Sequence, residues 1–406
     1  MKKIFTNARL VLPKEEQPQD GSLIVEGDRF ASADNANNDE GGETIDCKGR
    51  LLAPGIVDLG VFAIDKPAFR FGGVTRAALM PDQAPVLDLP AMIKHNAVEG
   101  KPDLWSHPIA AATKGLEGKQ LAEIGLMQRS GAKAVATGRQ WIADSGIMLR
   151  LLQYCKSLNL PLIVHSEDAG LTAGAVATNG ETATRLGLAS ATAAAEAVSI
   201  ARDIALVRET GAHVHFRQVT TADGLGLIRA AKSEQLPVTC GITPAHLLLS
   251  DIAISDFRTF ARLSPPLRSE ENRLACVEAV KDGTIDVISS GHDPRGPEDK
   301  RLPFAEAAPG MAGAETLLAL SFTLVRDEVI SIGRLFELLS GNPAKILGVE
   351  AGLLQAGYEA DFILIDEDAP WQVDTRKMAA AAGNTPFDGL PVQGRVTAIY
   401  KGGRAY

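Results

Sequence analysis

The stretch LLAPGIVDLGVF, residues 51–62, decides how the rest of the chain is interpreted. A Pro54-Gly55 turn opens it, and an apolar run follows that only Asp58 and Gly60 interrupt. A short run rich in β-branched residues that begins after a turn is typical of a buried strand in a parallel sheet. We therefore expect such a strand over residues 56–62.

Similar strands alternate with helices through the middle of the chain. The predicted strands cover residues 56–62, 75–80, 107–111, 133–136, 161–165, 213–217, 237–241 and 286–290. Helical stretches lie between most of them, such as residues 193–209 with apolar residues on one stripe. Eight alternating units predict an α/β fold of the (β/α)₈ barrel type over residues 54–347. The connection after the first strand is too short for a crossover that contains a full helix.

The two ends of the chain, 1–53 and 348–406, differ from the middle because they show strand patterns without alternating helices. Both read as short strands, at residues 3–11, 22–26, 44–46, 360–366 and 395–400, and residues 401–404 (KGGR) predict a hairpin turn. The polar segment 32–43 predicts a mobile loop. We expect the two ends to fold together as one small β-sandwich domain.

Composition narrows the class of protein. Of 406 residues, 45% are hydrophobic and 22% are charged, as in ordinary globular proteins. The net charge of −9 argues against a nucleic-acid partner. The four cysteines form no C-x-x-C pair and no disulfide framework. Without a signal peptide or a long apolar span, no membrane association and a cytoplasmic location are expected.

Several motifs carry a family resemblance over nearly the whole chain. Besides P-G-x-x-D at 54–58, they are TKGLEG (113–118), ARDIAL (201–206), PPLR (265–268), DGTID (282–286), GNPAKILG (341–348) and NTPFDG (384–389). The chain resembles the amidohydrolases, and most closely the dihydroorotases of de novo pyrimidine biosynthesis. The resemblance implies a cyclic amidohydrolase with two zinc ions at the C-terminal ends of the barrel strands. It also implies a helix after the first strand, which we expect this chain to have deleted.

The chain departs from the family at the metal and substrate positions. The family's H-x-H-x-R on the first strand becomes Gly60, Phe62 and Ile64. Thr137 and Gln218 stand where the resemblance places a metal-binding aspartate and a metal-binding histidine. Gly291 replaces the aspartate that binds metal and acts as the general base. We therefore expect no catalytic residue, no metal site and no cofactor.

A few polar residues remain at strand ends. His165 and His292 are the residual candidates for metal binding, although two imidazoles do not make a zinc site without a third ligand. Asp293 is a weak candidate for the base, because Pro294 turns the chain directly after it. Arg295 and Arg139 are candidates for binding an anionic substrate group, although most arginines are simply solvated.

Three hypotheses follow. The first is a non-catalytic dihydroorotase homologue. In some bacteria, inactive dihydroorotase-like chains assemble with aspartate carbamoyltransferase, so the resemblance implies that enzyme as a partner in a homo- or hetero-oligomer. The alternative is an active dihydroorotase, or a related cyclic amidohydrolase, with a reduced zinc site around His165, His292 and an acidic neighbour. The third is a small-molecule sensor that keeps a pocket without chemistry.

Overall fold

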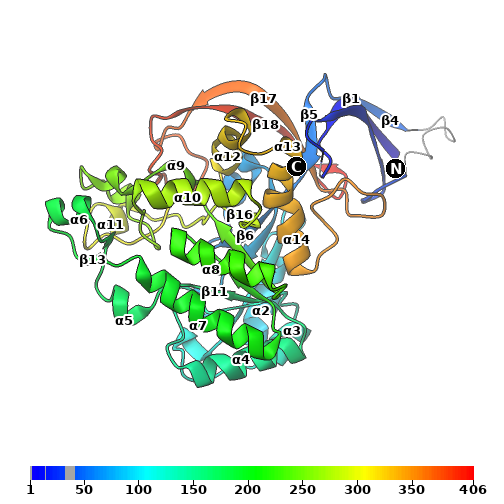
Figure 1. Cartoon of the computed structure of the whole chain (residues 1–406). Coiled ribbons are helices and arrows are strands. Elements are labelled where there is room, and N and C mark those ends of the chain that lie inside the picture. The colour runs from blue at the N-terminus through cyan, green and yellow to red at the C-terminus, as the bar shows by residue number, and fades with distance from the viewer. Residues whose placement is uncertain (1, 14, 33–41) are drawn as a thin grey trace.

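The computed structural model describes residues 2–13, 15–32 and 42–406 (Figure 1). Most of the segment predicted as a mobile loop, residues 33–41, lies outside the described residues. Among the described residues, no helix is both long and apolar enough to cross a membrane.

The middle of the chain forms the expected parallel barrel. Its strands are β6 (Ile56–Val61), β7 (Val74–Leu79), β8 (Trp105–Pro108), β9 (Ala110–Ala111), β10 (Val135–Ala136), β11 (Leu162–Val164), β14 (Val214–Phe216), β15 (Val238–Ile242) and β16 (Val287–Ile288). They pair in the orders β6-β7-β8 and β9-β10-β11-β14-β15-β16, and β8 and β9 are consecutive parts of one predicted strand. The fold class is confirmed.

The first and last strands close the barrel through polar contacts. The backbone N–H of Phe62 donates to the carbonyl of His292 at 2.8 Å. The backbone N–H of Ser290 donates to the buried carboxylate of Asp58 at 3.0 Å. Burial raises the pKa of Asp58, and the hydrogen bonds from Ser290 oppose that shift. The aspartate of the opening P-G-x-x-D motif therefore has a structural role at the barrel seam.

Helices cover the outside of the barrel, as Figure 1 shows for α4, α7, α8 and α10. The longer ones are α2 (Pro90–Glu99), α4 (Ser145–Ser157), α7 (Ala194–Thr210), α8 (Ala222–Ser233), α10 (Glu270–Lys281) and α12 (Leu317–Arg326). The shorter ones are α3 (Ile124–Arg129), α5 (Ala169–Thr172), α6 (Glu181–Leu186), α9 (Pro244–Leu248), α11 (Pro297–Lys300), α13 (Ile332–Phe336), the π-helical η5 (Glu337–Gly341) and α14 (Asn342–Leu347). Helix α7 buries Ile200, Ile204 and Val207, as its apolar stripe predicts.

The prediction that the first helix is deleted is wrong. A two-turn helix, α1 (Lys66–Gly72), follows β6. Asp65 caps it by accepting a hydrogen bond from the N–H of Ala68 at 3.3 Å, and Gly73 ends it in the left-handed conformation at φ 81°. A good cap at each end lets a short helix form inside a short connection.

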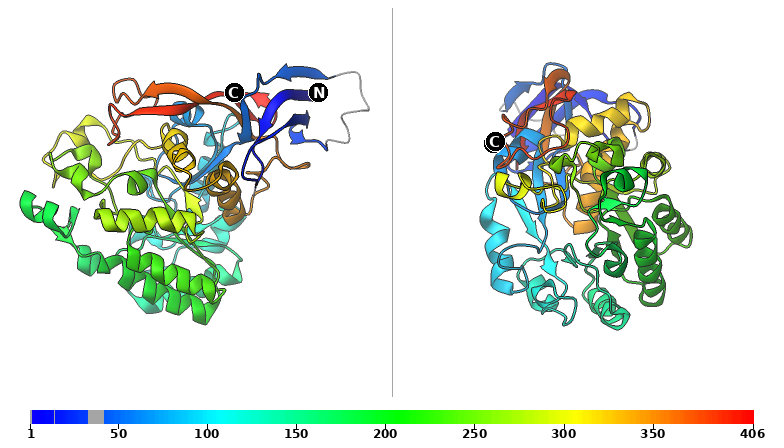
Figure 2. Two further views of the ribbon diagram at one scale, coloured as in Figure 1. Left: turned by 45° about the horizontal axis from the view of Figure 1, so that its top comes forward. Right: turned by 90° about the vertical axis from the view of Figure 1, so that its left-hand side faces the viewer.

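Both chain ends contribute to a second, mixed sheet. Its strands are β1 (Lys2–Leu10), β2 (Gln19–Glu26), β3 (Arg29–Phe30), β4 (Glu43–Asp46), β5 (Leu51–Pro54), β17 (Phe362–Gln372), β18 (Pro391–Lys401) and β19 (Arg404–Ala405). Their order is β19-β18-β17-β5-β1-β2-β3, with β4 beside β1, and Figure 2 shows both termini in this sheet. Gly402 and Gly403 make the predicted hairpin turn at φ 53° and 69°. The domain boundaries at residues 53/54 and 347/348 stay predictions.

Candidate functional site

The C-terminal ends of the barrel strands form the mouth of the barrel, and they surround very little empty space. An inner cavity of about 30 Å³ lies between Phe62, Arg217, Gln218, Gly291 and Asp293. That volume holds about two water molecules. A second cavity of about 250 Å³ lies beside it, and its lining includes His165 and Glu167. The inner part of the barrel mouth is thus filled by the protein's own side chains.

Arg217 occupies much of this inner space. It follows strand β14, and only 5% of its surface is exposed. Its Cδ lies 3.7 Å from the point where Gly60 would have a Cβ atom, and its Nη2 lies 3.2 Å from Nδ1 of His165. Burial, followed by the charge of Arg139, lowers its pKa to about 10, so the guanidinium stays charged at neutral pH. A fixed cation therefore lies next to two positions that the family uses for metal ligands.

Phe62 lies between two such cations. The guanidinium carbon of Arg139 is 3.7 Å from the centre of the phenyl ring, and that of Arg217 is 5.1 Å from it. Guanidinium groups at these distances are attracted to the face of an aromatic ring. The ring lies where the family resemblance predicts a metal-binding histidine, and it packs against two guanidinium groups instead.

Asp293 is held by the two arginines that the sequence suggested as anion binders. Arg139 donates to its Oδ2 at 2.8 Å, and Arg295 donates to the same oxygen at 3.2 Å. Asn384, from the NTPFDG motif, fixes this loop by accepting from the N–H of Arg295 at 3.0 Å. Binding of a substrate anion by Arg139 and Arg295 stays a prediction, and such an anion would compete with Asp293.

His165 belongs to a buried chain of polar groups. Its Nε2 lies 3.4 Å from Glu167, and Arg268 donates to that carboxylate at 2.8 Å. Burial favours the neutral form of Glu167, but the hydrogen bond from His165 and the charge of Arg268 outweigh it and lower the pKa to about 2. Glu167 is therefore a carboxylate at neutral pH, with its charge balanced inside the protein.

His292 has separate partners from His165. It is fully buried, its Nδ1 accepts from the N–H of Ala314 at 3.3 Å, and its Nε2 lies 3.4 Å from Asp65. Its ring packs against Phe69 of α1 with 5.4 Å between the centroids. The helix that the sequence interpretation omitted is thus what engages His292.

The donor set does not fit a binuclear zinc centre. Within residues 2–13, 15–32 and 42–406, no three His, Cys, Asp or Glu side chains are grouped where they could hold a metal ion. Thr137, where the family resemblance predicts a metal-binding aspartate, accepts from the N–H of His165 at 3.1 Å. The amide oxygen of Gln218 is buried, and no group in the described part of the chain forms a hydrogen bond with it. Gly60 and Gly291 offer no side chain at all.

Two further histidines, His246 and His215, make structural hydrogen bonds. His246 binds Thr243 at 2.8 Å and the carbonyl of Pro265 at 3.1 Å. His215 is buried and binds Thr239 at 3.0 Å. His213 instead borders a large cavity at the other end of the barrel.

Sequence reasoning missed the buried ionic residues of the mouth. Glu196 is fully buried and accepts from the backbone N–H and hydroxyl groups of both Thr220 and Thr221. Arg268, noted only as part of a motif, joins Thr220 to Glu167. The available signal was a charged residue inside an apolar segment, as at Arg217, because such residues are seldom buried unless they are paired.

Known proteins resemble this chain over its full length. The model described as the amidohydrolase family matches residues 106–406. A dihydroorotase of Pelotomaculum thermopropionicum is 36% identical, and the match covers 100% of this chain and 98% of that protein. A dihydroorotase of Desulforapulum autotrophicum is 35% identical over 98% of this chain and 97% of its own length.

Solved structures agree on the fold. The L-hydantoinase of Arthrobacter aurescens superposes with a TM-score of 0.87 at 24% identity, over 99% of this chain and 95% of that one. The dihydropyrimidinase of Brevibacillus agri gives a TM-score of 0.84 at 21% identity, over 100% and 95%. The fold and the family model define the class as the amidohydrolases. On the full-length sequence matches, the chain belongs to the dihydroorotase family within that class.

Proposed function

We propose that this chain is a non-catalytic member of the dihydroorotase family that serves de novo pyrimidine biosynthesis as a scaffold for aspartate carbamoyltransferase. The observation that carries the proposal is the small volume of the cavity in the inner barrel mouth. There Arg217 and Phe62 fill the space next to the lost ligand positions and leave about 30 Å³. A cyclic amide and an activated water do not fit in that volume.

The chemistry that remains is insufficient for hydrolysis. A metal ion contributes several kcal/mol by activating water and polarising the substrate carbonyl. A general base contributes a further factor of about 10²–10⁴. Gly291 has no group to act as that base, and the neighbouring carboxylate of Asp293 already accepts hydrogen bonds from Arg139 and Arg295. We therefore expect no turnover.

The scaffold role is supported by the contrast between the retained fold and the missing catalytic groups. Within the described residues, the barrel has an extensive core that includes Phe69, Phe216 and Phe336, and the β domain has a core around Phe5 and Phe362. A family member that keeps its fold without its catalytic groups still offers a large surface to a partner. Aspartate carbamoyltransferase is the partner that the family resemblance implies.

Co-expression with the cognate aspartate carbamoyltransferase tests this role. The two chains are expected to elute together in size-exclusion chromatography, at a larger mass than either alone. The transcarbamoylase is expected to lose activity or assembly when this chain is omitted. Separate elution, together with a fully assembled and active transcarbamoylase on its own, would overturn the scaffold proposal.

The second candidate is an active dihydroorotase or related cyclic amidohydrolase. It is favoured by relatives of 33–36% identity that are named dihydroorotase and by the 250 Å³ cavity that reaches His165 and Glu167. Metal analysis of protein purified without chelators separates the candidates. One or more tightly bound zinc ions per chain, lost on His165→Ala, would favour this alternative.

A further inference from the structure

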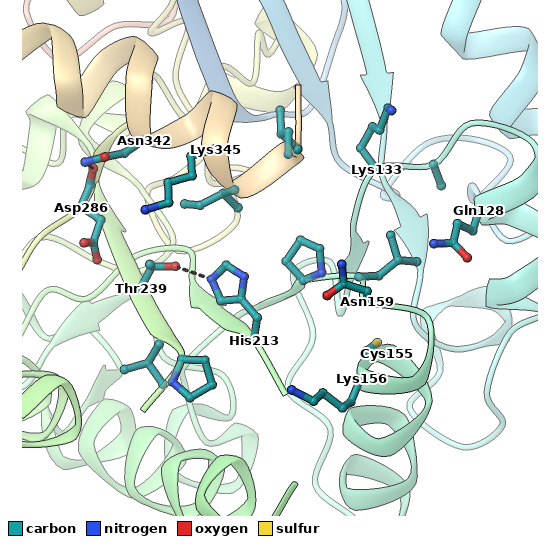
Figure 3. A pocket seen from close by; sticks show the side chains of 18 of the residues that line it. Gln128, Lys133, Cys155, Lys156, Asn159, His213, Thr239, Asp286, Asn342 and Lys345 are labelled. Atoms are coloured by element: carbon teal, nitrogen blue, oxygen red, sulfur yellow. Dashed lines mark hydrogen bonds between the residues drawn. The ribbon is translucent and has the colours of Figure 1, made fainter. Parts of the chain in front are cut away.

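A large cavity lies at the end of the barrel opposite the mouth. Its volume is about 850 Å³, and segments that lead into β10, β11, β14, β15 and β16 line it together with α14 (Figure 3). Small-molecule sites typically span roughly 300–1,000 Å³. The cavity therefore has the size of a ligand site, at an end of the barrel that the family's chemistry does not use.

The charge around this cavity is strongly positive. Lys133, Lys156 and Lys345 border it, and none has an ion-pair or side-chain hydrogen-bond partner within the described part of the chain. The one acidic residue in the lining, Asp286, is neutralised because both its oxygens accept from Lys232 at 2.7 Å. Three unpaired cations around one cavity contrast with a chain whose net charge is −9.

Neutral groups complete the lining. His213 binds the hydroxyl of Thr239 at 3.3 Å, and burial is the main cause that lowers its pKa, so it is neutral at pH 7. Figure 3 shows Lys345 and Lys156 on opposite sides of His213, with Asn159 also facing the open space. The lining also includes apolar side chains, such as Leu160, Val238 and Ile346. One ligand in this cavity can therefore contact hydrogen-bonding groups, apolar side chains and cations together.

We propose that this cavity binds an organic phosphate, a small molecule with a compact apolar or aromatic body and at least two negative charges. Lysine ammonium groups bind phosphate as mobile point charges, and the apolar wall would take the body of the ligand. The site is separate from the barrel mouth, and its occupancy does not depend on whether the chain hydrolyses anything.

Calorimetric titration of the full chain tests the proposal, with inorganic pyrophosphate, ATP and UTP as probes. At least one nucleotide is expected to bind more tightly than pyrophosphate, because only a nucleotide also uses the apolar wall. The affinity is expected to fall as salt is raised. Failure of all three probes to bind up to millimolar concentration would overturn the proposal. Binding of pyrophosphate alone would show simple charge attraction and would also count against it.

Matched variants locate the binding. The triple variant Lys133→Gln, Lys156→Gln, Lys345→Gln is expected to weaken nucleotide binding at least about tenfold. The control is Lys94→Gln, Lys114→Gln, Lys281→Gln, which removes the same charge at exposed positions outside the cavity lining. The control should retain the affinity, and an equal loss in both would contradict the proposal. Hydrogen exchange supports it if the nucleotide protects residues 211–213 and 342–348, and contradicts it if only the barrel mouth is protected.

Discussion

The guanidinium carbon of Arg139 lies 3.7 Å from the centre of the Phe62 ring. Phe62 stands at a metal-ligand position of the family, and Arg217 lies on the same ring at 5.1 Å. Two side-chain cations thus lie beside a position that the family resemblance assigned to a metal ligand, and Asp293 pairs with Arg139 at 2.8 Å. The mouth is thus an ionic and aromatic cluster formed by the protein's own side chains.

The first prediction concerns restoring that centre. The variant Gly60→His, Phe62→His, Gln218→His, Gly291→Asp returns four donors, but Arg217 remains in the space between them. In addition, the φ of 126° at Gly60 strains any side chain there. We expect no stoichiometric zinc by metal analysis of this quadruple variant, and measurable zinc only when Arg217→Ala is added. Tight zinc binding by the quadruple variant alone would show that Arg217 does not block the site.

The second prediction concerns the Phe62 contact. Phe62→Ala removes a ring that is only 9% exposed and leaves two guanidinium groups without it. We expect the free energy of unfolding in urea to fall by about 3 kcal/mol. Phe257→Ala is the control, because Phe257 is 49% exposed and should change stability by less than about 0.5 kcal/mol. Equal effects of the two substitutions would contradict the packing described for the mouth.

The third prediction concerns acid stability. Burial, and then the charges of His213, Arg217 and Lys232, lower the pKa of His215 from 6.5 to about 3. Between pH 6.5 and pH 3, His215 therefore binds a proton in the unfolded chain but not in the folded chain. The free energy of unfolding falls as the pH falls through this range.

Replacing His215 should remove this part of the pH dependence. His215→Asn is expected to show a smaller fall in the free energy of unfolding between pH 7 and pH 5 than the parent chain. His95→Asn, at an exposed position on α2, should keep the parent slope. A parent slope in His215→Asn would mean that this histidine is not held neutral by its surroundings.

The fourth prediction concerns the junction of the barrel with the β domain. Arg76 of β7 donates to Asp361 at 2.9 Å, and Lys401 of β18 donates to the same carboxylate at 2.8 Å. Glu359 also pairs with both cations, so Asp361→Ala leaves each of them one carboxylate partner. The substitution should cost about 3 kcal/mol of unfolding free energy, at the low end of the range for breaking a buried ion pair. Glu234→Ala breaks an exposed pair with Arg208 and should cost less than about 1 kcal/mol. Similar small losses in both variants would show that this junction contributes little to stability.

Local sequence patterns predicted the barrel well, because strand runs are local features, whereas the loss of metal ligands stays a prediction. Short apolar runs marked every barrel strand, and Gly60 and Gly291 carry no donor in any fold. The helix at α1 was missed although Asp65 and Gly73 signal its two ends. The position of Arg217 could not be predicted, because its contacts come from residues far apart in the chain.

The cavity lined by lysines could not be predicted from the sequence either. Lys133 and Lys345 are more than two hundred residues apart, and only closure of the barrel brings them and Lys156 to one cavity. Each of them alone looks like an ordinary solvated lysine. Unpaired cations therefore become informative only when the fold shows which ones share a surface.

The most direct test of the central claim is dihydroorotate hydrolysis by the purified chain in zinc-containing buffer. The dihydroorotase of Pelotomaculum thermopropionicum, assayed alongside, is the positive control. The filled mouth predicts no hydrolysis above that of buffer alone. Turnover at ordinary enzyme rates, about 1–10³ s⁻¹, would contradict the account and show that the chain assembles a working site despite Arg217, Phe62 and Gly291.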